Sequence, residues 1–190
     1  MHRIDRGFGA VCLMIAMAIT AGCVTVRIGG QPSDGMAQPR TTGILGAAAL
    51  QDQHFLGKVQ DALVNAAHNP AWMRQCIEEA GGIDAVVLIR PIPLANTAGQ
   101  QYLLEGKPPC AYGARMPFYW VIARSGDQVR VLADLGAADG VGLGRSRTNG
   151  YRDVVTTGVV GAGSEVCEET WTFNGTRYDG LADTIRCRPL

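Results

Sequence analysis

The chain lacks the excess of positive charge that marks most nucleic-acid-binding proteins. Its 17 basic residues equal its 17 acidic residues, so the formal net charge is +0 at pH 7. A protein that binds phosphate backbones needs a basic surface, and a balanced chain has no overall field to attract them. We therefore expect no nucleic-acid partner.

The residues that most often build catalytic and metal centres are also scarce. The chain has only 3 histidines, and in one helix His54 and His68 would lie roughly 21 Å apart, too far to share a metal ion. No cysteine pair has the CxxC spacing of a zinc site. Gly163-Ser164-Glu165 lacks the second glycine of a nucleophile elbow. The sequence therefore indicates no catalytic residue, no metal and no cofactor.

A long hydrophobic run of membrane-spanning length is missing as well. The apolar run at residues 7–19 is shorter than the roughly 20 residues that a bilayer requires. Arg3 and Arg6 precede this run, and the small residues Thr20-Ala21-Gly22 follow it. A basic start, an apolar stretch and small residues are typical of a secretory signal. We predict that residues 1–22 are a signal peptide.

Cys23 comes directly after those small residues, and this arrangement resembles the lipobox of bacterial lipoproteins, although Thr20 stands where these usually have Leu. The resemblance implies cleavage before Cys23 and acyl chains on that residue. Each buried CH₂ group of an acyl chain contributes about 0.8 kcal/mol to membrane anchoring. Val24, rather than the Asp that retains lipoproteins of enteric bacteria in the inner membrane, implies an outer-membrane anchor and a domain that faces the periplasm. An ordinary secretory signal with a chance cysteine is the alternative.

Without the signal, the chain divides into a short tether and one larger part. Residues 23–48 contain the lipidated cysteine and a segment rich in Gly, Pro, Gln, Ser and Thr, a composition that favours a flexible tether. Residues 49–190 are long enough to bury a core, and we expect a single domain there.

Four cysteines, Cys76, Cys110, Cys167 and Cys187, fall in this domain. An even number of cysteines in an exported protein indicates disulfides, here two. Four cysteines allow three pairings, of which we favour Cys167–Cys187 and Cys76–Cys110, because the first pair flanks a hairpin-like segment with an Asn-Gly turn. Free buried thiols are the alternative.

Helical spacing comes first in the domain. Apolar residues from Phe55 to Ala67 recur every three or four positions, which predicts a helix that ends before Asn69-Pro70. Asn69 can cap a second helix, with Pro70 at its first position and Gly81-Gly82 at its end. The apolar side of that helix is expected to hold Trp72, Met73, Cys76, Ile77 and Ala80.

Strand signals follow from residue 84 onward. We expect strands at residues 85–89, 101–105, 118–123, 128–133, 151–160, 165–173, 176–178 and 184–187, and a glycine-rich loop at 136–144. Helices followed by strands are typical of the α+β class. The predicted fold is two N-terminal helices packed on an antiparallel β-sheet of about six to eight strands.

The segment from Arg145 to Val155, together with residues 171–178, resembles a pattern that recurs in uncharacterised exported bacterial proteins. The resemblance covers roughly the last 80 residues and implies a fold but no activity. Arg145, Arg147 and Arg152 are candidates for an anion-binding patch that recognises lipid phosphate or a carboxylate. The alternative is a solvated turn.

These observations favour an outer-membrane-anchored lipoprotein that binds an envelope protein or a cell-wall component. A tether raises the local concentration of the domain near such partners. Two alternatives stay open. One is an envelope hydrolase that combines His54 with distant carboxylates such as Asp134, Asp153 or Glu168. The other is a structural subunit of an envelope complex, which would expose an apolar patch.

Overall fold

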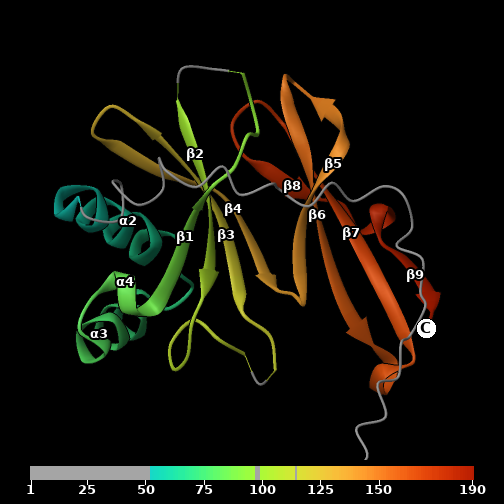
Figure 1. Ribbon diagram of the computed structural model, residues 1–190, viewed down its shortest axis with the longest axis horizontal. Coiled ribbons are helices and arrows are strands. Elements are labelled where there is room, and N and C mark those ends of the chain that lie inside the picture. Colours follow the sequence, from blue (N-terminus) through green and yellow to red (C-terminus); the bar gives the residue numbers. More distant parts are fainter. Residues whose placement is uncertain (1–51, 97–98, 114) are drawn as a thin grey trace, which may run out of the picture. The chain divides into compact units, whose positions relative to one another are not determined.

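The computed structural model describes residues 52–96, 99–113 and 115–190. The predictions for the signal peptide, for Cys23 and for the tether lie outside these described residues. Within them, three helices come first and the strands follow (Figure 1).

Side-chain caps define the helices α2 (Gln53–Ala66) and α3 (Pro70–Ala80). Asp52 accepts a hydrogen bond from the Phe55 amide at 3.1 Å, and Asn69 accepts one from the Trp72 amide at 3.1 Å. Gly81, with a φ of 90°, ends α3 in the left-handed conformation that glycine tolerates best. Both predicted helices are therefore confirmed. A single turn, α4 (Ile83–Val86), then leads into the first strand.

One expectation for α3 is wrong. Trp72 was placed on the apolar side of this helix, but it is 49% exposed. It lies in the first turn of α3, and the residues of this helix that are fully buried are Met73 and Ile77.

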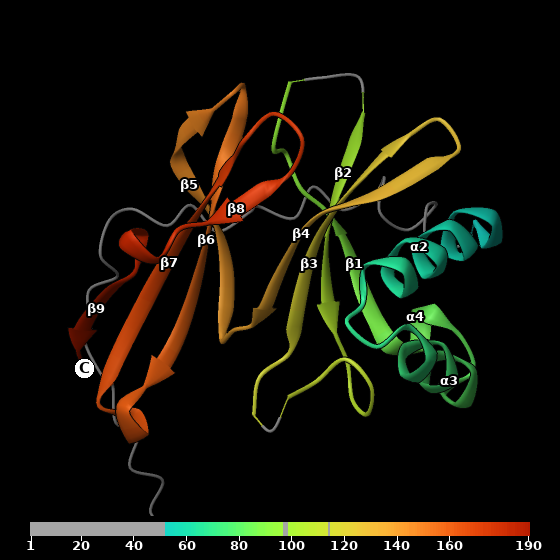
Figure 2. The same ribbon diagram turned by 180° about the vertical axis from the view of Figure 1, so that it is seen from behind.

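The first sheet is antiparallel and runs in the order β1-β2-β3-β4. Its strands are β1 (Val87–Pro91), β2 (Gln100–Gly106), β3 (Phe118–Ser125) and β4 (Gln128–Ala137). The helices pack on one face of this sheet (Figures 1 and 2). The resulting core includes Phe55, Val59, Leu63, Ile77, Tyr102, Leu104, Trp120 and Ile122.

The second sheet contains the remaining strands in the order β5-β6-β7-β8, with β9 also paired to β7. They are β5 (Gly140–Thr148), β6 (Tyr151–Val160), β7 (Glu165–Phe173), β8 (Tyr178–Gly180) and β9 (Arg186–Pro189). The register pairs Phe173 with Tyr178 and Cys167 with Cys187, so β8 and β9 follow one another along the same edge of β7. Short 3₁₀ turns occur at Gly161–Gly163 and Ala182–Thr184.

The antiparallel α+β class is confirmed, but the single sheet is wrong. The described residues form two sheets, of four and five strands. The change of sheet occurs at Asp139, whose amide donates to Thr157 of β6 at 2.8 Å. Its carboxylate also accepts from the Val159 amide at 2.6 Å. After β4 the chain therefore pairs with β6 and leaves the first sheet.

The predicted glycine-rich loop at residues 136–144 is also wrong, because most of it belongs to β5. Gly140, Gly142 and Gly144 alternate along this strand with Val141 and Leu143, which pack toward the apolar core. A Cβ at Gly144 would lie 3.3 Å from the backbone oxygen of Asp153. Glycine therefore permits a close approach of β5 to β6, and it gives this strand the composition of a loop.

The two sheets share a second core. Leu103, Val121 and Leu132 come from the face of the first sheet that is opposite the helices. They pack in one cluster with Val154, Phe173 and Tyr178 of the second sheet. The first sheet is therefore covered on both faces.

The two disulfides among the described residues link different parts of the fold. Cys76 of α3 is bonded to Cys110, which follows β2, and Cys167 of β7 is bonded to Cys187 of β9. These are the two pairs that the sequence favoured. The first bond joins the helical layer to the first sheet, and the second fixes the edge strand of the second sheet.

Candidate binding cleft

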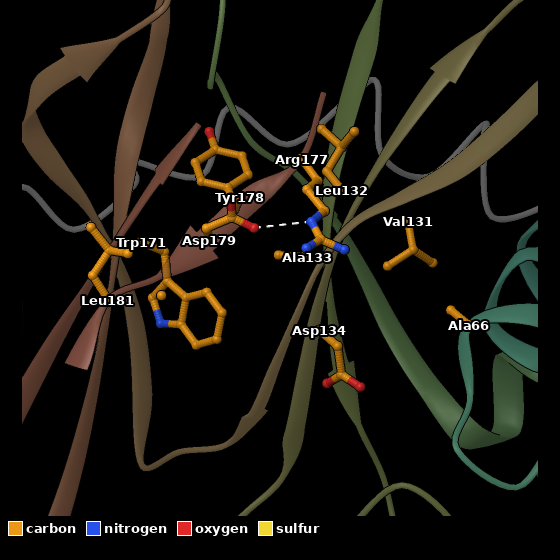
Figure 3. A pocket seen from close by; sticks show the side chains of 11 residues that line it. Ala66, Val131, Leu132, Ala133, Asp134, Trp171, Arg177, Tyr178, Asp179 and Leu181 are labelled. Atoms are coloured by element: carbon orange, nitrogen blue, oxygen red, sulfur yellow. Dashed lines mark hydrogen bonds and ion pairs between the residues drawn. The ribbon is translucent and has the colours of Figure 1, made fainter. Parts of the chain in front are cut away.

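A cleft of about 610 Å³ lies where β4 meets the edge of the second sheet (Figure 3). This volume is within the range of small-molecule sites. Its lining residues come from α2, β4, β7, β8 and the segments beside β8. They are Ala66, Val131, Leu132, Ala133, Asp134, Trp171, Arg177, Tyr178, Asp179, Gly180 and Leu181.

Trp171 supplies the aromatic wall of the cleft. It pairs with Gly180 of β8, and a Cβ at Gly180 would lie 3.1 Å from two atoms of the indole ring. The ring therefore packs closely on the β8 backbone, which only a residue without a side chain allows. The indole Nε1 donates to Thr156 Oγ1 at 3.2 Å. Packing on one side and a hydrogen bond together fix the orientation of this half-buried ring.

Arg177 and Asp179 form an ion pair at the rim. The Nε of Arg177 donates to Oδ1 of Asp179 at 3.0 Å, and the side-chain Nδ2 of Asn174 donates to Oδ2 at 2.6 Å. Both carboxylate oxygens of Asp179 are therefore engaged. Among the described residues, the terminal nitrogens of Arg177 make no hydrogen bond, and its side chain is 71% exposed. These nitrogens can donate to a ligand.

Asp134 contributes the other charged group of the rim. Its Oδ1 accepts from the Gly136 amide at 3.1 Å. Its second oxygen accepts no hydrogen bond from any residue that the structure describes. In Figure 3, the Asp134 carboxylate and the Arg177 guanidinium lie on one side of the cleft and Trp171 lies on the other.

Tyr178 anchors the inner wall. Its hydroxyl donates to the carbonyl of Arg152 at 2.7 Å, and its ring lies against Phe173, with ring centroids 5.4 Å apart. Burial, followed by the nearby Asp153 carboxylate, raises the pKa of Tyr178 well above its usual value. The phenol therefore stays neutral and holds β8 in place.

The candidate anion patch has other partners in the structure. Arg152 donates to the carbonyls of Leu143 and Gly144, and Arg147 donates to the carbonyls of Leu94 and Gly150. These bonds tie β5 to β6 and to the segment after β1. Arg145 is exposed on β5, near a register shift in its pairing with β6. The contacts of Arg147 and Arg152 favour a structural role for these two residues, and an anion site stays a prediction.

The residues of the hydrolase alternative lie in different environments. His54 Nε2 lies 3.8 Å from Asp127 beside the β3–β4 turn, and the buried Asp153 accepts from the Thr148 hydroxyl at 2.8 Å. Glu168 pairs with Thr157 in the second sheet. Across the described ranges, no hydrogen bond or ion pair joins His54 to Asp134, Asp153 or Glu168.

The sequence did not predict this cleft. From the sequence, Trp171 and Arg177 are only parts of a predicted hairpin and of the recurrent pattern at residues 171–178, and Asp179 is not singled out. That hairpin does occur around the Asn174-Gly175 turn. What the pattern could not indicate is that β4 lies across from them. The sequence signal for the position of the ring is the glycine at residue 180, which pairs with Trp171 in the hairpin and leaves room for the indole.

The described residues contain no group of three or more His, Cys, Asp or Glu side chains placed to hold a metal ion. None of the described helices is long and apolar enough to cross a membrane. Comparisons with models of protein families, with curated proteins and with solved structures found no match for this chain.

Proposed function

We propose that this protein is a lipoprotein of the bacterial outer membrane whose domain faces the periplasm and binds an envelope partner. The observation that carries the proposal is the pair of disulfides, Cys76–Cys110 and Cys167–Cys187. Disulfides persist in oxidising compartments such as the periplasm and are rare in the cytosol. The apolar run that ends at Cys23 agrees with export, and its resemblance to a lipobox supports the anchor.

The cleft supports a binding role for the domain. It combines an oriented aromatic ring, apolar walls and a few polar groups that have unused hydrogen-bonding capacity. Ligand sites in proteins usually have this composition. A tether would keep such a site close to the membrane and the cell wall, so that even weak binding gives substantial occupancy.

Labelling with an alkyne analogue of palmitate tests the anchor. Wild-type protein should be labelled and should fractionate with the outer membrane. Cys23→Ala should lose the label and the fractionation, because the acylated sulfur is gone. Cys12→Ala is the matched control, since that cysteine lies inside the predicted signal, and it should keep both. Equal labelling of Cys23→Ala and wild type would contradict the proposal.

A second candidate, a subunit of an envelope complex, is favoured by one observation. Large apolar residues that are 43% to 72% exposed gather in or beside the second sheet, namely Val159, Val160, Leu181, Ile185 and Leu190. Exposed apolar groups of this kind often mark protein interfaces. If this candidate holds, the protein should migrate within a larger complex in mild detergent, and Val159→Asp should release it. Migration as a monomer before and after the substitution argues against it.

A further inference from the structure

We propose that the cleft between β4 and β8 binds a neutral carbohydrate, with Trp171 as the platform on which a sugar ring stacks. The inference rests on the binding role proposed above and specifies the chemical class of the ligand.

The indole of Trp171 is held in a fixed orientation by its neighbours. One side of the ring packs on Gly180, and its Nε1 is held by Thr156. Because the ring is fixed before a ligand arrives, little side-chain entropy is lost on binding. The C–H groups on the flat face of a sugar ring carry a small positive charge and are attracted to the negative face of an aromatic ring. A rigid, half-buried indole in the wall of a cleft therefore suits a pyranose.

The polar rim opposite Trp171 has unused hydrogen-bonding capacity. The terminal nitrogens of Arg177 are donors and the second oxygen of Asp134 is an acceptor, all without partners among the residues that the structure describes. A hydroxyl group both donates and accepts hydrogen bonds. Neighbouring hydroxyls of one sugar can therefore satisfy Arg177 and Asp134 together, while the sugar ring covers Trp171.

The net charge of the lining favours a neutral ligand over an anionic one. Arg177 is the one basic residue of the lining, and it is paired with Asp179, whereas Asp134 adds a further negative charge. An anionic ligand would meet a net negative rim, in which Asp179 already offsets the charge of Arg177. A neutral ligand avoids this cost. A small quaternary ammonium, which also binds aromatic faces, is the competing chemistry that the experiment must separate.

Tryptophan fluorescence can report binding directly. The chain has 3 tryptophans, of which Trp120 is buried at 6% exposure and Trp72 is exposed on α3. The full chain carrying Trp72→Phe, purified in detergent micelles with both disulfides intact, leaves Trp171 as the solvent-accessible reporter. Its titrants are the β-1,4-linked trisaccharide of N-acetylglucosamine, maltotriose and tetramethylammonium chloride. We expect saturable binding of at least one trisaccharide, with a Kd of roughly 1 mM or tighter.

Variants locate the site. Trp171→Ala should weaken trisaccharide binding by about tenfold or more, because a central aromatic contact is removed. Trp171→Phe keeps an aromatic face and should weaken binding less. Asp134→Asn and Arg177→Gln should each weaken it by a few fold, since one hydrogen bond to a hydroxyl is altered. Calorimetry replaces fluorescence for the Trp171 variants, and circular dichroism checks their fold. Trp72→Ala removes an exposed indole outside the cleft and should bind as wild type does.

Three outcomes would overturn the inference: no saturable binding of either trisaccharide, trisaccharide binding that Trp171→Ala and Asp134→Asn leave unchanged, and saturable binding of tetramethylammonium alone. The palmitate label and the outer-membrane fractionation are measured separately and do not depend on any ligand. Failure of the carbohydrate inference and failure of the anchoring proposal are therefore distinguishable.

Discussion

The two sheets of this domain are both antiparallel but are stabilised in different ways. In the first sheet, Leu104, Val121 and Ile122 are 0% exposed, and both faces are covered by other parts of the fold. In the second sheet, Val154 is equally buried, but Val159 and Val160 at the far end of the same strand are each 43% exposed. Burial therefore extends through the first sheet and is concentrated at one end of the second.

Hydrogen bonds and a disulfide provide a larger share of the stability of the second sheet. Arg152 of β6 donates to the Gly144 carbonyl of β5 at 2.8 Å, and Thr184, in the 3₁₀ turn before β9, donates to the Thr170 carbonyl of β7 at 2.9 Å. The Cys167–Cys187 bond adds a covalent link at its edge. A hydrogen bond contributes only about 1 kcal/mol net, whereas burial of a large apolar side chain contributes about 1.5–3 kcal/mol.

The cleft lies at the border between the two sheets because they are covered to different extents. The inner face of the second sheet is not fully covered by the first sheet, so Trp171 is only half-buried where it lies beside β4. The well-packed first sheet supplies a rigid wall, and the less covered second sheet supplies the half-buried ring of Trp171. Stability and binding are thus provided by different parts of one domain.

Matched leucine truncations should show the largest difference in stability between the two sheets. Leu104→Ala should lower the free energy of unfolding by about 2–5 kcal/mol, because it opens a cavity in a closed core. Leu143→Ala, at a half-buried position of β5, should cost about 1 kcal/mol. Urea unfolding measures both. Equal losses would show that burial does not separate the two sheets.

Removal of the Cys167–Cys187 bond should affect the second sheet selectively. The bonded residues are 20 positions apart, and for a loop of this length the chain-entropy model gives about 3 kcal/mol of stabilisation. The double variant Cys167→Ser with Cys187→Ser should lose amide protection in β7 and β9 first, as seen by hydrogen exchange. The double variant of Cys76 and Cys110 is the control and should affect α3 instead. A uniform loss of protection in both variants would contradict this assignment.

The sequence predicted those elements that depend on local patterns. The Asn69-Pro70 start of α3, its Gly81 end and the Asn174-Gly175 turn are each determined by a few adjacent residues, and all three occur. The disulfide pairing was also predicted, because one pair flanks a single hairpin-like segment.

What failed depends on contacts between distant residues. The division into two sheets follows from the pairing of Asp139 with β6, about 20 positions away. The strand β5 was missed because its glycines give it the composition of a loop, and their close contact with β6 is not visible in the sequence. The cleft requires β4 and β8 to meet, and no local pattern in either strand encodes that contact.

Alkaline pH should test the buried tyrosines, of which Tyr119 and Tyr178 lie in the core between the sheets. Burial raises the pKa of Tyr178, and also those of Tyr102 and Tyr119, above the usual value. Unfolded tyrosines lose their protons near pH 10 while these stay protonated, so the unfolded state binds fewer protons and stability falls as pH rises above about 10. Tyr178→Phe should reduce that slope by up to about 1.4 kcal/mol per pH unit. Urea unfolding from pH 8 to 11.5 measures it, and an unchanged slope contradicts the role of Tyr178.

The smallest expected effect concerns the helical layer that covers the first sheet. Asn69 accepts a hydrogen bond from the Trp72 amide at 3.1 Å, and Asn69→Ala should lower the free energy of unfolding by about 1 kcal/mol. Asn69→Asp keeps an accepting oxygen and should unfold as wild type does. Asn65→Ala, an exposed change inside α2, is the control for loss of an asparagine alone. Because Met73 and Ile77 keep α3 packed, loss of the cap should fray its first turn without uncovering the sheet. If Asn69→Ala instead exposed the amides of β1 and β2 to exchange, the cap would be holding the whole layer, and the first sheet would depend on a directional contact as the second does.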